Sequence, residues 1–166
     1  MSEARTEAIK LLIVDDEIEF LTALQERLEM RDFQVGSASS GQQALELCKQ
    51  EKFDLALVDL KMQGMDGKEL LARLKAEHQF LEVIILTGHG SLGSAVDCSK
   101  LGAFCYLPKP YELEELLQVL SDAYQERLRN KFQADQKRME ELMQLAQGES
   151  PLAILRRMRQ LDDDSR

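Results

Sequence analysis

The 166-residue chain lacks features that would place it in several large classes of protein. Its three cysteines, Cys48, Cys98 and Cys105, are odd in number and show no Cys-x-x-Cys or Cys/His spacing, which argues against a disulfide framework and against a zinc site. Residues 1–9 hold no apolar segment of signal-peptide length, and no later run approaches the roughly 18 apolar residues of a membrane span. We therefore expect a soluble cytoplasmic protein in which the cysteines are small buried residues.

A basic surface is also missing. The formal net charge is −9, which disfavours partners that bind only because they are polyanionic, such as nucleic acid or an acidic lipid surface. Residues 1–121 carry 21 acidic and 12 basic side chains, whereas residues 122–166 carry nine of each. We expect neither direct DNA binding nor membrane insertion, and a C-terminal segment of balanced charge.

Short apolar runs alternate with helical patterns along the first 120 residues or so. The runs lie at about residues 10–14, 33–38, 54–58, 83–87 and 103–107. Between them, apolar residues recur at helical spacing, as in Leu70, Leu71 and Leu74. This alternation predicts an α/β fold, a doubly wound five-stranded parallel sheet with helices on both faces. The fourth helical segment, about residues 91–101, contains Gly93 and several small residues, so we expect it to be the least rigid helix.

Polar residues stand where four of the predicted strands end. Asp15 and Asp16 follow the first apolar run, Asp59 the third, Thr87 the fourth and Lys109 the fifth. The carboxyl ends of parallel strands line one crevice, so these side chains should converge there. Three carboxylates at one edge repel unless a cation screens them, and Mg²⁺ prefers oxygen ligands. The sequence therefore predicts a site for Mg²⁺ and a phosphoryl group at this edge.

Two of these signals also have a purely structural interpretation. Asp15 and Asp16 could cap the next helix, because Asp is a favoured N-cap and acidic residues suit a first turn. The run Thr87-Gly88-His89-Gly90 could be an ordinary strand-to-helix turn. Lys109 is the stronger functional signal, since the prolines on either side fix the backbone and would hold the ammonium over the crevice.

Five motifs in this order resemble the receiver domain of two-component response regulators, the CheY-like fold. They are Leu12-Ile13-Val14-Asp15-Asp16-Glu17, Val58-Asp59-Leu60-Lys61-Met62, Gly64-Met65-Asp66-Gly67, Leu86-Thr87-Gly88-His89-Gly90 and Tyr106-Leu107-Pro108-Lys109-Pro110. The resemblance covers about residues 8–122 and is strongest to receivers that precede sigma-54-dependent activator ATPases, although no such ATPase is recognisable here. It implies the flavodoxin-like strand order 2-1-3-4-5.

The resemblance also implies a role for each site residue. Asp59 would be the phosphoacceptor, taking a phosphoryl group from a phosphohistidine on a sensor histidine kinase or phosphotransfer protein. Asp16 and Asp59 would ligate Mg²⁺, Asp15 would assist through water, and the backbone carbonyl of Lys61 would complete the protein ligands. Besides Mg²⁺, the side chains of Thr87 and Lys109 would neutralise charge on the transferring group.

A conformational switch is a further implication of the resemblance. Phosphorylation would add about −1.5 to −2 charge to the crevice and draw Thr87 inward. The ring of Tyr106 would then rotate from solvent into the gap and remodel the surface of the fourth helix, fifth strand and fifth helix. The alternative is that Tyr106 is a strand residue that only packs on a helix. Gln63 stands where many members of the family have proline, so we expect a less rigid loop after Asp59.

The C-terminal segment continues as helix far beyond what the domain needs. Nothing breaks the helical pattern from Tyr111 to about Gln147, some 35 residues or about 50 Å. An apolar stripe continues along it, formed by Leu128, Phe132, Met139, Leu142 and Ala146. Asp135 stands where a heptad would need Leu or Met, so an imperfect coiled coil and an amphipathic helix packing on another surface are both open.

A second, shorter helix is predicted after this one. Gly148 supplies a stop, Ser150-Pro151 an N-cap and first-turn proline, and the pattern ends at about Leu161. We therefore expect a receiver domain at residues 1–122 and a helical extension at residues 123–166.

Together these features predict a stand-alone response regulator that catalyses its own phosphorylation and dephosphorylation and is otherwise no enzyme. It would switch a partner-binding or homodimer surface, located on the C-terminal helix or on the face of the fourth helix, fifth strand and fifth helix. The main alternative is an adaptor whose extension binds a partner independently of phosphorylation. A phosphatase of the haloacid-dehalogenase type is disfavoured because Lys61, and not a second Asp, stands two residues after Asp59.

Overall fold

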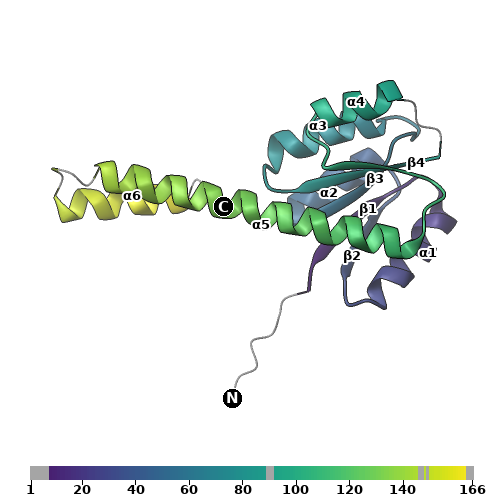
Figure 1. The fold of residues 1–166 in the computed structure, drawn as a ribbon, viewed down its shortest axis with the longest axis horizontal. Coiled ribbons are helices and arrows are strands. Elements are labelled where there is room, and N and C mark those ends of the chain that lie inside the picture. The colour runs from purple at the N-terminus through teal and green to yellow at the C-terminus, as the bar shows by residue number, and fades with distance from the viewer. Residues whose placement is uncertain (1–7, 89–91, 146–147, 149, 164–166) are drawn as a thin grey trace, which may run out of the picture. The chain divides into compact units, whose positions relative to one another are not determined.

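The computed structural model describes residues 8–88, 92–145, 148 and 150–163. His89 and Gly90 of the predicted loop, and Ala146 and Gln147 at the predicted helix end, lie outside these residues. The chain divides into two compact units, residues 1–127 and residues 128–166, and each is described by itself (Figure 1).

The first unit is built on a five-stranded parallel sheet with the order β2-β1-β3-β4-β5. The strands are β1 (Lys10–Val14), β2 (Gln34–Ala38), β3 (Leu55–Asp59), β4 (Glu82–Thr87) and β5 (Cys105–Pro108). None of their bounds departs from the predicted range by more than two residues. The doubly wound fold and the strand order predicted from the sequence are both confirmed.

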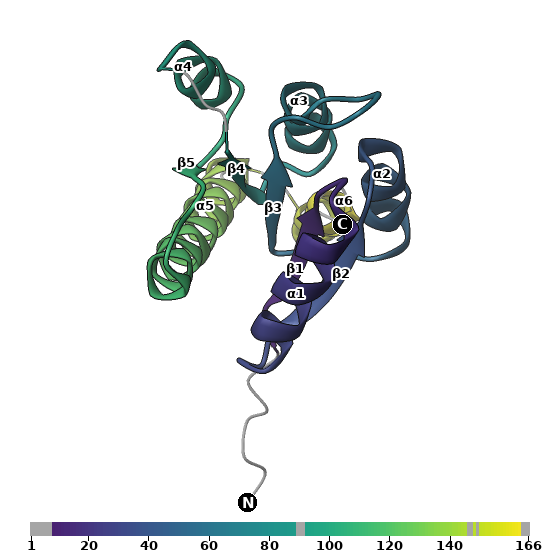
Figure 2. The ribbon, with the colours of Figure 1, turned by 90° about the vertical axis from the view of Figure 1, so that its right-hand side faces the viewer.

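Helices cover both faces of this sheet, as a parallel sheet requires. The helices of the chain are α1 (Ile18–Glu29), α2 (Gly41–Gln50), α3 (Gly67–Glu77), α4 (Leu92–Lys100), α5 (Leu113–Leu145) and α6 (Pro151–Asp163). Figure 2 shows α1 and α5 on one face of the sheet and α2, α3 and α4 on the other. Each face therefore has its own hydrophobic core.

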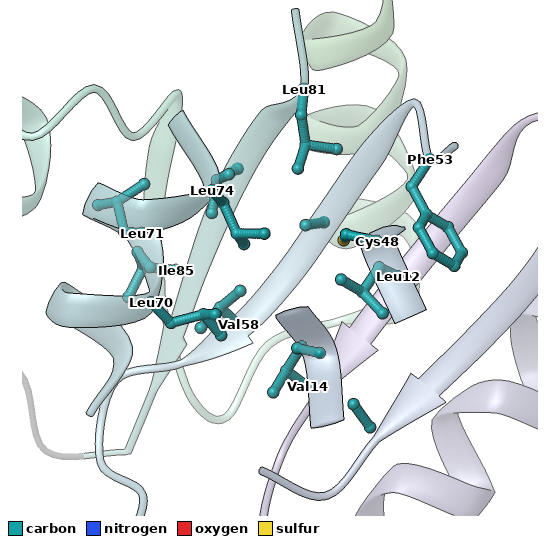
Figure 3. Packing of buried hydrophobic residues seen from close by; sticks show 14 of the residues in the cluster. Leu12, Val14, Cys48, Phe53, Val58, Leu70, Leu71, Leu74, Leu81 and Ile85 are labelled. Carbon is teal, nitrogen blue, oxygen red and sulfur yellow. The ribbon is translucent and has the colours of Figure 1, made fainter. Parts of the chain in front are cut away.

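Alternation along the strands assigns side chains to the two cores. In β1, Leu12 and Val14 join the core under α2, α3 and α4, whereas Leu11 and Ile13 join the core under α1 and α5. Figure 3 shows the first of these cores, where Leu12, Val58 and Ile85 meet the leucines of α3 and Cys48 of α2. Cys48 and Cys98 are buried, as predicted, whereas Cys105 is only half-buried, and all three are free thiols.

The first part of α5 packs on the sheet through residues that the sequence pattern identified. Leu116 and Leu120 are buried there, with Tyr124 partly buried beside them. Arg127 then contacts residues near the amino ends of β3 and β4. Its Nε lies 3.2 Å from Asp54 Oδ1, and its Nη1 donates to the backbone oxygen of Phe80 at 2.7 Å. The first unit ends at this residue, a few positions beyond the predicted boundary at residue 122.

The second unit contains the remainder of α5 and the short helix α6. Gly148 has φ +100°, the left-handed conformation expected of a helix stop, and Ser150 Oγ accepts a hydrogen bond from the Ala153 N–H at 3.3 Å. The predicted apolar stripe does not form a core here, because Leu128, Phe132 and Met139 are exposed. Among the described residues, no helix combines the length and the apolar character needed to cross a membrane.

Candidate functional site

The predicted site residues lie at the carboxyl ends of neighbouring strands. Asp15 and Asp16 follow β1, Asp59 and Thr87 are the last residues of β3 and β4, and Lys109 follows β5. The register aligns these ends: Val14 pairs with Val58, Asp59 with Leu86, and Thr87 with Pro108. Four crossovers thus bring site residues that are far apart in the sequence to a single edge of the sheet.

The three carboxylates form a compact cluster. Asp15, Asp16 and Asp59 each offer an oxygen atom within 4.8 Å of the other two, and Asp15 and Asp59 are buried. Asp15 Oδ1 accepts a hydrogen bond from the Glu17 N–H at 2.9 Å, and Asp16 Oδ2 accepts one from the Gln63 N–H at 3.3 Å. The N-cap of α1 is Glu17, without a side-chain cap hydrogen bond, so the alternative that the acidic pair caps this helix is wrong.

Lys109 brings a positive charge to the cluster. Its Nζ lies 3.0 Å from Asp15 Oδ2 and 4.0 Å from Asp59 Oδ1. Its backbone N–H donates to the Thr87 oxygen at 2.7 Å, which extends the pairing of β4 and β5 by one step. The ammonium therefore bridges two of the carboxylates from a fixed position on the backbone.

The surroundings of Asp59 raise the pKa of its carboxyl group. Burial raises its pKa from 3.8 to about 6. The Lys109 ammonium opposes that rise, Asp15 and Asp16 add to it, and the backbone N–H of Lys61 lowers the pKa by a hydrogen bond. The ionised form of Asp59 is thus less stable in the folded protein than in water, and a cation in the cluster would remove this penalty.

The two predicted switch residues are both drawn toward the interior. Thr87 is buried. Tyr106 is half-buried and packs against the core under α2, α3 and α4, and its hydroxyl is buried without a hydrogen-bond partner among the described residues. Simple packing of the ring accounts for its apolar contacts but leaves this hydroxyl unexplained, since buried polar groups are normally paired.

Two residues at the site had no role in the sequence interpretation beyond helix or motif membership. The ring of Phe20, in the first turn of α1, lies with its centroid 4.0 Å from Lys109 Nζ, a cation–π distance. A Cβ atom on Gly67 would lie 2.5 Å from the backbone oxygen of Asp59, so α3 can start beside β3 only with glycine there. The Gly67 position was visible within its motif, whereas no local pattern signals the contact of Phe20.

A groove of about 540 Å³ lies beside the carboxylate cluster. Its lining includes Phe20 and Arg27 of α1, and Lys109, Pro110 and Tyr111 after β5. Burial raises the pKa of Tyr111 to about 12, and the Asp15 carboxylate adds to this rise, so the phenol is neutral at physiological pH. The groove thus lies beside Lys109, on the α1 side of this edge of the sheet.

Comparison with known proteins gives the class to which this fold and site belong. The family described as the response regulator receiver domain matches residues 11–121, two thirds of the chain. The protein therefore belongs to the response regulator receiver domain family.

Its relatives include regulators of several kinds. It is 39% identical over 117 residues to the transcriptional regulatory protein ZraR of Klebsiella oxytoca, which covers 70% of this chain and 26% of that protein. It is 37% identical over 107 residues to sporulation initiation phosphotransferase F of Bacillus subtilis, which covers 64% of this chain and 86% of that protein. The chain thus spans about a quarter of the length of the first curated relatives that it matches.

Solved structures give the same fold. The CheY-like receiver domain protein of Methanospirillum hungatei superposes with a TM-score of 0.71 at 30% identity, covering 74% of this chain and 98% of that one. NtrX of Brucella abortus superposes with a TM-score of 0.74 at 26% identity, covering 83% of this chain and 33% of that one. The resemblance stated from five short motifs is confirmed.

Proposed function

We propose that this protein is a response regulator in which Asp59 accepts a phosphoryl group from the phosphohistidine of a sensor kinase or a phosphotransfer protein. The observation that carries this proposal is the placement of Asp59 at the end of β3, with two further carboxylates and Lys109 around it. A cation held by the three carboxylates, together with the Lys109 ammonium, would supply the positive charge that the oxygens of a transferring phosphoryl group need.

The carboxylate cluster fits a Mg²⁺ ion. Burial raises the pKa of Asp59, and repulsion from Asp15 and Asp16 adds to this rise, so a cation between the carboxylates would be favourable. Asp15 already uses both oxygens, one for the Glu17 N–H and one for Lys109, which supports a water-mediated role for it. Asp16, Asp59 and the Lys61 carbonyl would then hold the ion directly. When bound, Mg²⁺ neutralises phosphoryl oxygens and the carboxylates together.

The side chains have distinct tasks in the transfer. A carboxylate oxygen of Asp59 forms the new bond to phosphorus while the bond from phosphorus to the histidine nitrogen breaks, and the imidazole leaves with the electron pair. Asp59 needs no general base, because the nucleophile is an anion. Lys109 and Thr87 stabilise the equatorial oxygens. Attack of water on the acyl phosphate at the same site gives dephosphorylation.

The output of this reaction is a change of surface. In the proposed switch, Thr87 moves toward the phosphoryl group and Tyr106 responds, which alters the face formed by α4, β5 and α5. We propose that the protein works as a stand-alone regulator in the cytoplasm and that this face or the helical extension binds a partner or a second copy. The stand-alone role is supported by sporulation initiation phosphotransferase F of Bacillus subtilis, because the matched region covers 86% of that protein.

The test is an intact-mass measurement after incubation with Mg²⁺ and acetyl phosphate. Wild-type protein should gain one phosphoryl group and the Asp59→Asn variant none, and a chelator should abolish the gain. A control receiver phosphorylated in parallel guards against inactive reagent. If wild type stays unmodified while the control reacts, the phosphoacceptor role is wrong.

The second candidate is an adaptor whose extension binds a partner without regard to phosphorylation. It is favoured by the exposed apolar side chains of the second unit. An adaptor would keep its affinity for a partner in the Asp59→Asn variant, whereas a switch would lose the part of that affinity that depends on phosphorylation.

A further inference from the structure

The second unit exposes an unusual amount of apolar surface for a segment of its length. Seven large apolar side chains in it have exposed fractions between 44% and 67%. They are Leu128, Phe132, Met139 and Met143 of α5, and Leu152, Leu155 and Met158 of α6. A groove of about 350 Å³ runs along α5 among the central members of this set, between Phe132 and Met143.

The seven exposed apolar side chains do not lie on the faces through which α5 and α6 contact each other. On α5, a row at four-residue spacing is less exposed than its surroundings: Asn130, Ala134, Arg138 and Leu142. On α6, the half-buried residues are Ala153 and Ile154. In Figure 1, α6 runs back beside the last part of α5. These rows therefore mark the contact within the hairpin, and the seven apolar residues lie outside it.

Helix geometry places the seven side chains on one side of the hairpin. With about 100° per residue, the exposed stripe of α5 is rotated from its half-buried row by roughly 120°, and that of α6 by roughly 150° in the same sense. Because α5 and α6 run in opposite directions, the same sense of rotation carries both stripes to the same side. We call this side the hairpin face. It has the form of one half of a four-helix bundle.

We propose that the hairpin face is covered by a second copy of this chain, with the two α5 helices antiparallel about a two-fold axis near residues 135 and 136. This inference gives a geometry to the dimerisation part of the proposed function and rests on that part alone. It differs from a parallel coiled coil, in which each residue would face its own counterpart.

The α5 stripe is symmetric about its centre, as a contact with a second copy requires. A two-fold contact requires a surface that is complementary to itself. The stripe has this property, since Leu128 and Met143 lie at equal distances from the centre, as do Phe132 and Met139, and the polar pair Asp135 and Gln136 occupies the centre. Antiparallel pairing therefore sets Leu128 against Met143 of the other copy, and Phe132 against Met139.

Charge also favours this pairing. Arg129 and Glu140 lie on the same flank of the stripe, within about 20° of each other around the helix axis. In the antiparallel arrangement this Arg129 falls about 3 Å along the axis from Glu140 of the other copy, well within the reach of both side chains. The symmetric arrangement creates the pair twice.

The size of the hairpin face also suits a second copy. Seven side chains exposed by about half in each of two copies amount to on the order of 1,500 Å², the size of a standard specific interface. Asp135 is the one poorly suited residue, because two copies would bring like charges near the axis. Arg138 Nη1 lies 3.4 Å from Asp135 Oδ1 in the same chain and offsets part of that repulsion.

The experiment is sedimentation velocity of the unphosphorylated full chain over a wide concentration range, which separates this inference from the chemistry of Asp59. Wild type should show a concentration-dependent dimer. Met139→Glu should weaken dimerisation by about tenfold or more, since it would bury an unpaired charge. Lys137→Gln, the same charge change of −1 at an exposed position about 150° around α5 from the stripe, should leave it unchanged. Asp135→Leu should strengthen it, which also guards against reading a folding defect as a lost contact.

Cross-linking decides the direction of the helices. In the antiparallel dimer, Gln136→Cys should cross-link between copies through a short bis-maleimide, and Leu128→Cys should not, because its two copies lie about 22 Å apart. Wild type controls for the three native cysteines. Arg129→Glu should weaken the dimer, and adding Glu140→Arg should restore it. A wild-type monomer at all concentrations, a dimer indifferent to Met139→Glu, or cross-linking through Leu128→Cys would each overturn the proposal.

Discussion

The two units of this chain use apolar residues in opposite ways. In the first, apolar residues of β1, β3 and β4 are buried from both sides by helices, and the polar residues at their ends converge on one site. In the second, an equally regular pattern leaves its large side chains exposed. Periodicity predicts which residues share a face, whereas only a partner element shows whether that face is covered.

The largest effect should come from the core of the first unit. Leu57→Ala removes a fully buried side chain from the sheet and should lower the free energy of unfolding by about 2–5 kcal/mol. Met143→Ala, at an exposed position, should change it by less than about 0.5 kcal/mol in dilute protein. Urea unfolding of both variants measures the difference. Equal losses would contradict the contrast between the units.

Gly67→Ala should be the next most damaging change. The added Cβ would lie 2.5 Å from the Asp59 backbone oxygen, so α3 or the end of β3 must shift, at a cost of about 1–3 kcal/mol. Because the shift occurs at Asp59 itself, phosphorylation by acetyl phosphate should also slow. Gly88→Ala is a matched control, because nothing lies within 4 Å of a Cβ there. An unchanged phosphorylation rate in Gly67→Ala would refute the positional role of this glycine.

Asp59→Asn should stabilise the protein at neutral pH in the absence of metal. The pKa of Asp59 is about 6 in the folded protein, against 3.8 for a free carboxyl group, so ionisation destabilises the fold. This penalty is absent below about pH 3.8 and fully present above about pH 6. The variant should therefore gain about 1–2 kcal/mol at pH 7.5, and the gain should shrink as the pH falls toward 4.

The same comparison tests the metal site. Addition of Mg²⁺ should raise the melting temperature of wild type at pH 7.5 and have a smaller effect on Asp59→Asn, because binding to the folded state stabilises it. Thermal unfolding with and without a chelator measures both quantities. A gain for Asp59→Asn that does not vary with pH would show that ionisation of Asp59 is not its cause.

Phe20→Leu should have the smallest effect. Loss of the cation–π contact with Lys109 is expected to cost about 1 kcal/mol, or about a fivefold slower phosphorylation of Asp59. Phe20→Tyr should keep the rate. In a Lys109→Ala background the effect of Phe20→Leu should vanish, because the ring acts through the ammonium. A persistent fivefold loss in that background would mean that Phe20 serves only the packing of α1.

Prediction from the sequence succeeded where one chain segment carries all the information. The run from Leu55 to Asp59 is apolar up to its last residue, and this indicates both a buried strand and a polar group at its end. Prediction failed for individual side-chain contacts between distant segments that the strand-end rule does not cover. The ring of Phe20 on Lys109 and the hydrogen bond from Arg127 to Phe80 join residues far apart in the sequence, and no periodicity records such pairs.

The sequence by itself determined the alternation of strands and helices, the family, and which residues stand at strand ends, because apolar periodicity and strand length are local properties. Only the tertiary structure decided that Asp15 is engaged by Lys109, that the Tyr106 hydroxyl is buried, and that the stripe of the second unit is exposed. These depend on which surfaces meet in space. Whether a side chain is buried depends on both of the elements that pack around it, and the local sequence describes only one of them.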